Sequence, residues 1–135
     1  MRMRRAVAGV GAGLLLAAAP VMAHHAFSAE FDIKKPFKLR GTLTKWEMIN
    51  PHSWFHIDVK GPDGNVVTWM IEGGSPNQLI RQGVTKHTVA VGTMLIIETY
   101  LAKDGTNKAV GRNFTLPDGR RLFLGGSAPG ANPNK

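Results

Sequence analysis

Residues 37–60 read FKLRGTLTKWEMINPHSWFHIDVK and predict the start of a β-rich fold. Phe37 to Ile49 and Ser53 to Lys60 form two runs with the alternation of apolar and polar side chains that is typical of strands. Between them, Asn50-Pro51-His52 is a turn signal, because proline at the second turn position presets φ. We therefore expect an antiparallel hairpin here.

The register of this hairpin follows if Pro51-His52 is a two-residue loop. The residues that face each other are then Met48 with Phe55 and Trp46 with Ile57 on an apolar face in the core, and Glu47 with His56 and Lys45 with Asp58 on an outer face. Both sets are chemically sensible, which supports the register. Leu39 and Leu43 have the opposite parity, so we expect a β-bulge near Thr44-Lys45.

Further runs separated by turn signals follow along the chain. They predict strands at Asn65 to Glu72, Met94 to Leu101, Ala109 to Leu116 and Arg121 to Leu124. Ser75 as a cap, with Pro76 next and Gln78 three residues after the cap, predicts a helix over Pro76 to Gln82. The predicted fold is mainly β: a small OB-like Greek-key barrel of about five to six strands with one short helix after the third strand. A looser β-sandwich also fits.

The first 23 residues have the features of a cleavable signal peptide. Three arginines within residues 2–5 precede an apolar run over residues 6–19, and residues 21–23 place small side chains at the −3 and −1 positions of a cleavage site. The apolar run is shorter than the roughly 20 residues that span a bilayer. We expect cleavage after Ala23, a periplasmic or secreted protein, and no transmembrane segment in the mature chain. An uncleaved N-terminal anchor is the alternative.

The mature chain is predicted to form one domain. Residues 24–35 are expected to be an N-terminal arm with little regular structure, residues 36–124 the β-barrel domain, and residues 125–135 a disordered tail. The chain has no cysteine, so disulfides are excluded and the fold is held by its core or by a metal.

The charge of the chain bears on its partners. The net charge of +8 falls to +5 when the three arginines of the signal leave. A moderate positive charge favours anionic partners, although it also serves solubility. Because the basic residues are scattered and the protein is exported, we expect a periplasmic protein or an envelope glycan as partner and no nucleic acid.

The mature N-terminus is the most distinctive chemical group that the sequence offers. Cleavage after Ala23 gives His24 a free α-amine beside its imidazole, and the two nitrogens can chelate one ion. His25, His52 or His56 would supply a third nitrogen. Such nitrogen-rich tetragonal sites suit Cu(II), with zinc as the second choice. The alternative is that the two histidines form a flexible polar start.

Trp54 suggests a different binding surface. On the expected outer face it lies with His56 and Lys60, and OB barrels bind ligands on such faces. The chain would then be a structural or interaction module for a protein or glycan, unless another segment covers Trp54.

A third possibility is a Cu(I) site built from methionines. Such a site would use Met48, Met70, His52 and a tryptophan face, and the thioethers of methionine are soft ligands that suit Cu(I). Met48 is expected to point inward, however, so only Met70 would face outward.

The residues do not predict catalysis. The chain has no cysteine, no G-x-S-x-G elbow, no H-E-x-x-H and no P-loop. The expected contact of Glu47 with His56 is typical of a cross-strand ion pair rather than an acid–base couple. We therefore predict a binding protein that is not an enzyme.

Four short motifs add a family resemblance. They are His24-His25-Ala26-Phe27, Asn50-Pro51-His52-Ser53-Trp54, Gly73-Gly74-Ser75-Pro76-Asn77-Gln78-Leu79 and Leu116-Pro117-Asp118-Gly119-Arg120. Together they resemble an uncharacterised family of exported bacterial proteins, a domain of unknown function, from His24 to about Leu124. The resemblance implies Gram-negative export and a small β-rich domain, with no catalytic residues to transfer. Ala26 stands where the family usually has serine, which removes no candidate ligand.

Overall fold

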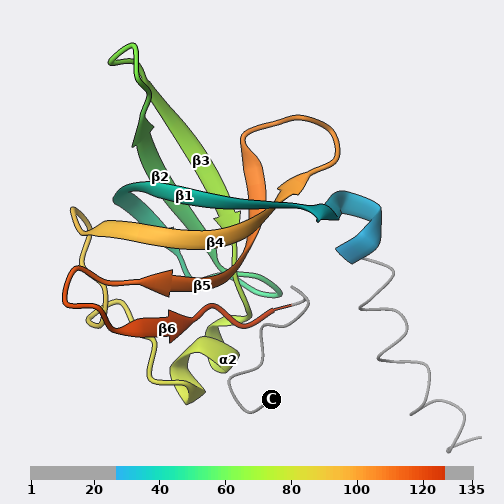
Figure 1. The fold of residues 1–135 in the computed structure, drawn as a ribbon. Helices are drawn as coiled ribbons and strands as arrows, with labels where there is room; N and C mark the ends of the chain where they lie inside the picture. The colour runs from blue at the N-terminus through green and yellow to red at the C-terminus, as the bar shows by residue number, and fades with distance from the viewer. Residues whose placement is uncertain (1–26, 127–135) are drawn as a thin grey trace, which may run out of the picture.

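The computed structural model describes residues 27–126, which fold into a mainly β structure (Figure 1). A helical turn at residues 27–30 leads into the first strand. The elements that follow are β1 (Phe31–Glu47), β2 (Trp54–Lys60), β3 (Val66–Glu72), α2 (Pro76–Arg81), β4 (Met94–Ala102), β5 (Lys108–Thr115) and β6 (Arg121–Phe123). The helix and the last five strands begin and end within one residue of the predicted bounds.

The six strands form one sheet in the order β3-β2-β1-β4-β5-β6. Neighbours in this order are antiparallel. In addition, β3 pairs with β5 in parallel. The first five strands therefore form a continuous circuit of hydrogen-bonded neighbours, from which the hairpin of β2 and β3 projects (Figure 1).

The long strand β1 turns a corner between two partners. Its first part pairs with β4 and its last part pairs with β2. The register with β2 shifts between Leu43 and Lys45, which confirms the predicted β-bulge. Just before the shift, a Cβ atom at Gly41 would collide with the backbone carbonyl of Asp58. Only glycine allows β1 and β2 to approach so closely at the corner.

The predicted register of β1 and β2 is wrong by two residues. The observed partners are Trp46 with Phe55, Lys45 with His56 and Glu47 with Trp54. The connection is longer than a Pro51-His52 loop, because β1 ends at Glu47 and β2 begins at Trp54. A shift of two residues preserves which side chains share a face. Trp46 is therefore buried, as predicted.

The expectation of an irregular arm up to residue 35 is also wrong, because β1 begins at Phe31. Phe27 and Phe31 pack with Tyr100 in a small apolar cluster, where the rings of Phe27 and Tyr100 lie edge to face with centroids 5.9 Å apart. Buried aromatic side chains thus hold this segment against β4. Of the predicted tail, residues 127–135 lie outside the described residues.

The main core lies inside the circuit of strands. Its largest fully buried side chains include Phe55, Ile57, Ile71, Leu95, Ile97 and Phe114. Helix α2 adds Leu79, which is fully buried. The predicted capping box is present: Gln78 N donates to Ser75 Oγ at 3.3 Å, and Ser75 N donates to Gln78 Oε1 at 3.0 Å.

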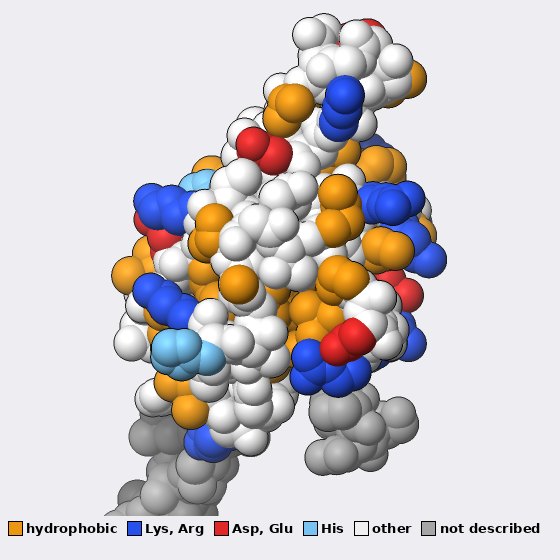
Figure 2. Space-filling view, turned by 90° about the vertical axis from the view of Figure 1, so that its left-hand side faces the viewer, with side chains coloured by type: hydrophobic (Ala, Val, Ile, Leu, Met, Phe, Trp, Pro, Cys, Tyr) orange, Lys and Arg blue, Asp and Glu red, His pale blue; other side chains and the backbone are white. Residues whose placement is uncertain are grey.

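On the face shown in Figure 2, Lys and Arg side chains are spread around the margins, while hydrophobic side chains gather towards the centre. Within residues 27–126, no helix has the length and apolar character needed to cross a membrane.

Candidate functional site

His52 and Glu72 meet where β1 connects to β2. The connection contains a cis peptide bond between Asn50 and Pro51. Two backbone hydrogen bonds of 2.9 Å, from Ser53 N to Gly74 O and from Gly73 N to Ser53 O, fasten it to the end of β3. They bring the Nδ1 atom of His52 to 3.1 Å from the Oε1 atom of Glu72.

This contact joins a buried carboxyl to a partly exposed imidazole. The side chain of Glu72 is 7% exposed and that of His52 is 38% exposed. The Nδ1 atom of His52 is itself buried and makes no regular hydrogen bond, so its interaction with Glu72 is an ion-pair contact. The ring consequently turns Nδ1 towards the interior.

Burial shifts the titration of Glu72. Burial raises the pKa of the carboxyl above the ordinary value of 4.5, although the charge of His52 lowers it. The charge of Glu30 raises this pKa further, while that of Lys108 lowers it. A buried carboxyl of this kind is stabilised when a proton or another cation neutralises it.

Lys108 links the same place to the N-terminal helical turn. It forms an ion pair with Glu30 and places its Nζ atom 5.1 Å from the centre of the Trp54 ring. The half-buried Trp54 ring therefore has a lysine over it and is not an open platform. Lys60 is exposed at the other end of β2.

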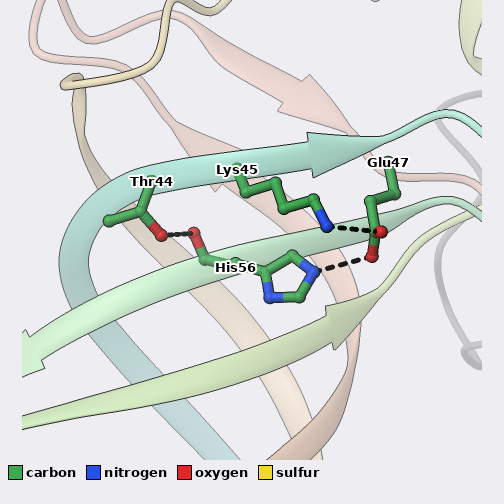
Figure 3. A network of polar contacts seen from close by, with 4 residues as sticks. All are labelled: Thr44, Lys45, Glu47 and His56. Carbon is green, nitrogen blue, oxygen red and sulfur yellow. Dashed lines mark hydrogen bonds and ion pairs between the residues drawn. The ribbon is translucent and has the colours of Figure 1, made fainter.

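His56 belongs to a second network on the outer face (Figure 3). Its Nε2 atom lies 2.8 Å from Glu47 Oε2, and Lys45 Nζ donates to Glu47 Oε1 at 2.7 Å. The hydrogen bond from Lys45, followed by that from His56, lowers the pKa of Glu47. Glu47 does contact His56, and both carboxylate oxygens have partners, as in a cross-strand ion pair.

The predicted metal ligands fall into three groups. His24 and His25 lie outside the described residues. His52 and His56 lie in the two separate networks, paired with different carboxylates. Among residues 27–126, no three side chains of His, Asp or Glu converge as a metal site would require. Residues 27–126 therefore do not by themselves supply three such ligands for a metal at His52.

The two methionines differ in exposure. Met48 packs partly buried against the core, where its sulfur lies 3.8 Å from Ser53 Oγ. Met70 is exposed and lies opposite His56 on the neighbouring strand. Met48 thus points inward and Met70 outward, as expected.

Glu72, Lys108 and Glu30 were not predicted as site residues. Glu72 could have been found, because it ends the predicted strand that follows β2, and the observed antiparallel pairing of β2 with β3 places it opposite Trp54. Lys108 arrives through the parallel pairing of β3 with β5, which places it opposite Met70. No local pattern predicts such a pairing, since its two strands are far apart in sequence.

Comparison with known proteins gives a family and no function. Neither the curated proteins nor the solved structures contain a match. A family of unknown function, DUF6152, matches residues 12–112, a span that includes both networks. The chain therefore belongs to the DUF6152 family.

Proposed function

We propose that the protein is an exported, non-enzymatic metal-binding protein. Cleavage after Ala23 creates the free amine of His24, which binds Cu(II) together with its own imidazole and with His52. Residues 1–23 act as the signal peptide that carries the protein to the periplasm. The circuit of five strands, with α2 between β3 and β4, is consistent with an OB-like Greek-key barrel as the scaffold.

The position of the helical turn at residues 27–30 carries this proposal. Glu30 pairs with Lys108, and both charges act on Glu72, the partner of His52. The arm thus enters the sheet at the place where His52 lies. Three peptide units separate His24 from Phe27, so their Cα atoms are at most about 11 Å apart. The approach of His24 to His52 is part of the proposal.

The chemistry of His52 also suits a metal. With Nδ1 turned to Glu72, Nε2 is the nitrogen left for a ligand, and a carboxylate on the far nitrogen orients such imidazoles and raises their basicity. A bound cation would offset the cost of burying the Glu72 charge. Amine and imidazole nitrogens favour Cu(II), with Zn(II) second. Glu72 would thus influence metal affinity through the orientation and basicity of the His52 imidazole.

The alternative function, a Trp54 platform for a protein or glycan, has less support. Lys108 lies over the Trp54 ring and is held there by Glu30. A partner that stacks on this ring would first have to displace an ion pair.

Copper titration of matched histidine variants tests the proposal. The His52→Asn variant of the processed protein is expected to bind Cu(II) at least about tenfold more weakly than the wild type, within the range seen when ligand-supporting groups are lost. His56→Asn is the control, because His56 is paired with Glu47. If both variants lose the same Cu(II) affinity, or if neither loses any, His52 is not a ligand of the site.

A further inference from the structure

His56 and Met70 lie side by side on the outer face, opposite each other on β2 and β3. The N–H group of Met70 donates to Asn107 O, away from β2. The carbonyl oxygen of His56 accepts from Thr44 Oγ1, away from β3. The two residues therefore form a non-hydrogen-bonded pair of the ladder, in which the Cα atoms are about 4.5 Å apart and the side chains are closest. An imidazole and a thioether thus share one small area of the surface.

Glu47 fixes the orientation of the His56 ring. An ionised carboxylate can only accept hydrogen bonds, so His56 Nε2 donates to Glu47 Oε2 at 2.8 Å. Nδ1 then carries the lone pair of the neutral imidazole. In Figure 3, this second ring nitrogen lies away from Glu47, on the side of the ring towards the ribbon of β3. The nitrogen that can bind a ligand therefore faces the strand that carries Met70.

The lysines around this pair are matched by carboxylates. Lys108 on β5 forms an ion pair with Glu30. Lys45 on β1 forms one with Glu47, with Nζ 2.7 Å from Oε1. Neither ammonium group is therefore an unmatched charge that would repel a cation bound between the imidazole and the thioether.

Met70 differs from the other two methionines that follow the signal peptide. Met48 packs against the core. Met94 is 43% exposed, but the residue opposite it on β1 is Thr42, which carries no imidazole. Met70 is 38% exposed and lies opposite a histidine. Of the three, Met70 is the one that combines an accessible thioether with a neighbouring imidazole.

We propose that His56 Nδ1 and Met70 Sδ bind a soft monovalent cation, Cu(I) or its chemical analogue Ag(I). Thioethers select Cu(I) and imidazole also suits copper, whereas a thioether binds Cu(II) only weakly. Cu(I) accepts low coordination numbers, so it does not require a cluster of three hard ligands. Glu47 is a positioning residue, because a carboxylate on the far nitrogen orients a ligating imidazole. The site is separate from the proposed Cu(II) site at His24 and does not depend on it.

Methyl NMR of the processed protein tests the site with Ag(I) alone as the probe. With isotope-labelled methionine methyl groups, stepwise addition of Ag(I) is expected to shift the Met70 signal and to leave the Met94 signal in place. The Met70→Leu variant assigns the shifted signal. Equal responses from both methyl groups would show binding to any exposed thioether and would overturn the proposal. An unchanged Met70 signal would also overturn it.

The affinity for Cu(I), measured without oxygen against a competing chelator, tests the thioether. Met70→Leu removes the sulfur with little change in volume and should weaken Cu(I) binding at least about tenfold, since the loss of a supporting group alone can cost this much. Met94→Leu is the matched control at an exposed methionine on another strand and should change Cu(I) binding little. Equal losses in the two variants, or no loss in Met70→Leu, would contradict the site.

Histidine variants separate this site from the proposed Cu(II) site. His56→Asn should weaken Cu(I) binding and abolish the Ag(I)-dependent shift of the Met70 methyl signal, which a merely structural role of His56 would not do. His52→Asn should leave that shift intact, whatever its effect on Cu(II). A Met70 shift that survives in His56→Asn would overturn the proposal. If His56→Asn fails to fold, the comparison of Met70→Leu with Met94→Leu decides, because both substitutions are at exposed positions.

Discussion

The Nδ1 atom of His52 lies 3.1 Å from the Oε1 atom of Glu72, whose carboxyl is almost completely buried. This contact joins the connection between β1 and β2 to the end of β3. It also explains why a histidine outside regular structure holds a defined orientation. The proposed copper site depends on this orientation, because it leaves Nε2 for a ligand.

Glu72 and Glu47 are expected to titrate on opposite sides of the ordinary value of 4.5. Burial raises the pKa of Glu72, whereas the hydrogen bonds from Lys45 and His56 lower the pKa of Glu47. Side-chain carboxyl chemical shifts followed by NMR against pH measure both directions. Shifts of the two groups in the same direction would contradict the two environments.

Glu72→Gln is expected to change the pH dependence of stability. The folded state binds the Glu72 proton more tightly than the unfolded chain, so unfolding free energy falls as pH rises from 4.5 through the raised pKa. The variant lacks this fall. Its unfolding free energy relative to wild type should therefore rise between about pH 4 and pH 7, as urea titrations would show.

Glu47→Gln provides the opposite control for that experiment. The lowered pKa of Glu47 contributes stability that is present above 4.5 and is lost as pH falls through the lowered pKa. Relative to wild type, the Glu47→Gln variant should therefore lose stability as pH rises. The same pH trend in both variants would show that net charge, not local environment, governs the effect.

Gly41→Ala is expected to destabilise the fold by at least about 1–3 kcal/mol, as overpacking does. The added Cβ would collide with the backbone carbonyl of Asp58, which cannot move without disturbing the pairing of β1 and β2. The loss is measured by urea unfolding. A neutral effect would mean that β1 and β2 do not approach closely at this corner.

Phe31→Ala distinguishes a packed first strand from a loose arm. Phe31 is 2% exposed in the cluster with Phe27 and Tyr100, so its loss should cost about 3–5 kcal/mol. A cost below about 0.5 kcal/mol, which is typical of exposed positions, would favour the unstructured arm. Thermal or urea unfolding measures the difference.

Ser75→Ala is expected to destabilise the protein by about 1 kcal/mol. Ser75 accepts the hydrogen bond from Gln78 N that caps α2, and the helix has only six residues over which to compensate. Ser75→Thr keeps the hydroxyl and should cost much less. Equal losses in the two variants would show that the cap does not stabilise α2.

Local signals predicted most of the secondary structure because turn residues with specific chemistry separate the strands that follow β1. Pro76 after Ser75, with Gln78 at the third helical position, defines α2 without tertiary information. The face of each residue around the bulge was also predictable, since the alternation of Trp46 and Glu47 survives a shift of two residues.

Non-local contacts explain the errors. The length of the connection before Trp54 depends on its hydrogen bonds to β3, which a turn signal does not contain. Phe31 becomes part of a strand because Ala102 of β4 lies beside it. Likewise, the covering of Trp54 depends on Lys108, which reaches it through the parallel β3–β5 pairing.

The most direct test of the proposed copper site is Cu(II) titration of two proteins that differ only at the N-terminus. Both begin at His24, as verified by mass spectrometry, and the second carries an acetyl group on its α-amine. The first is expected to bind one Cu(II) tightly, and acetylation should weaken binding at least about tenfold, because it removes the amine nitrogen from the chelate with the imidazole of His24. Equal affinities, or no tight binding by either protein, would contradict the N-terminal site.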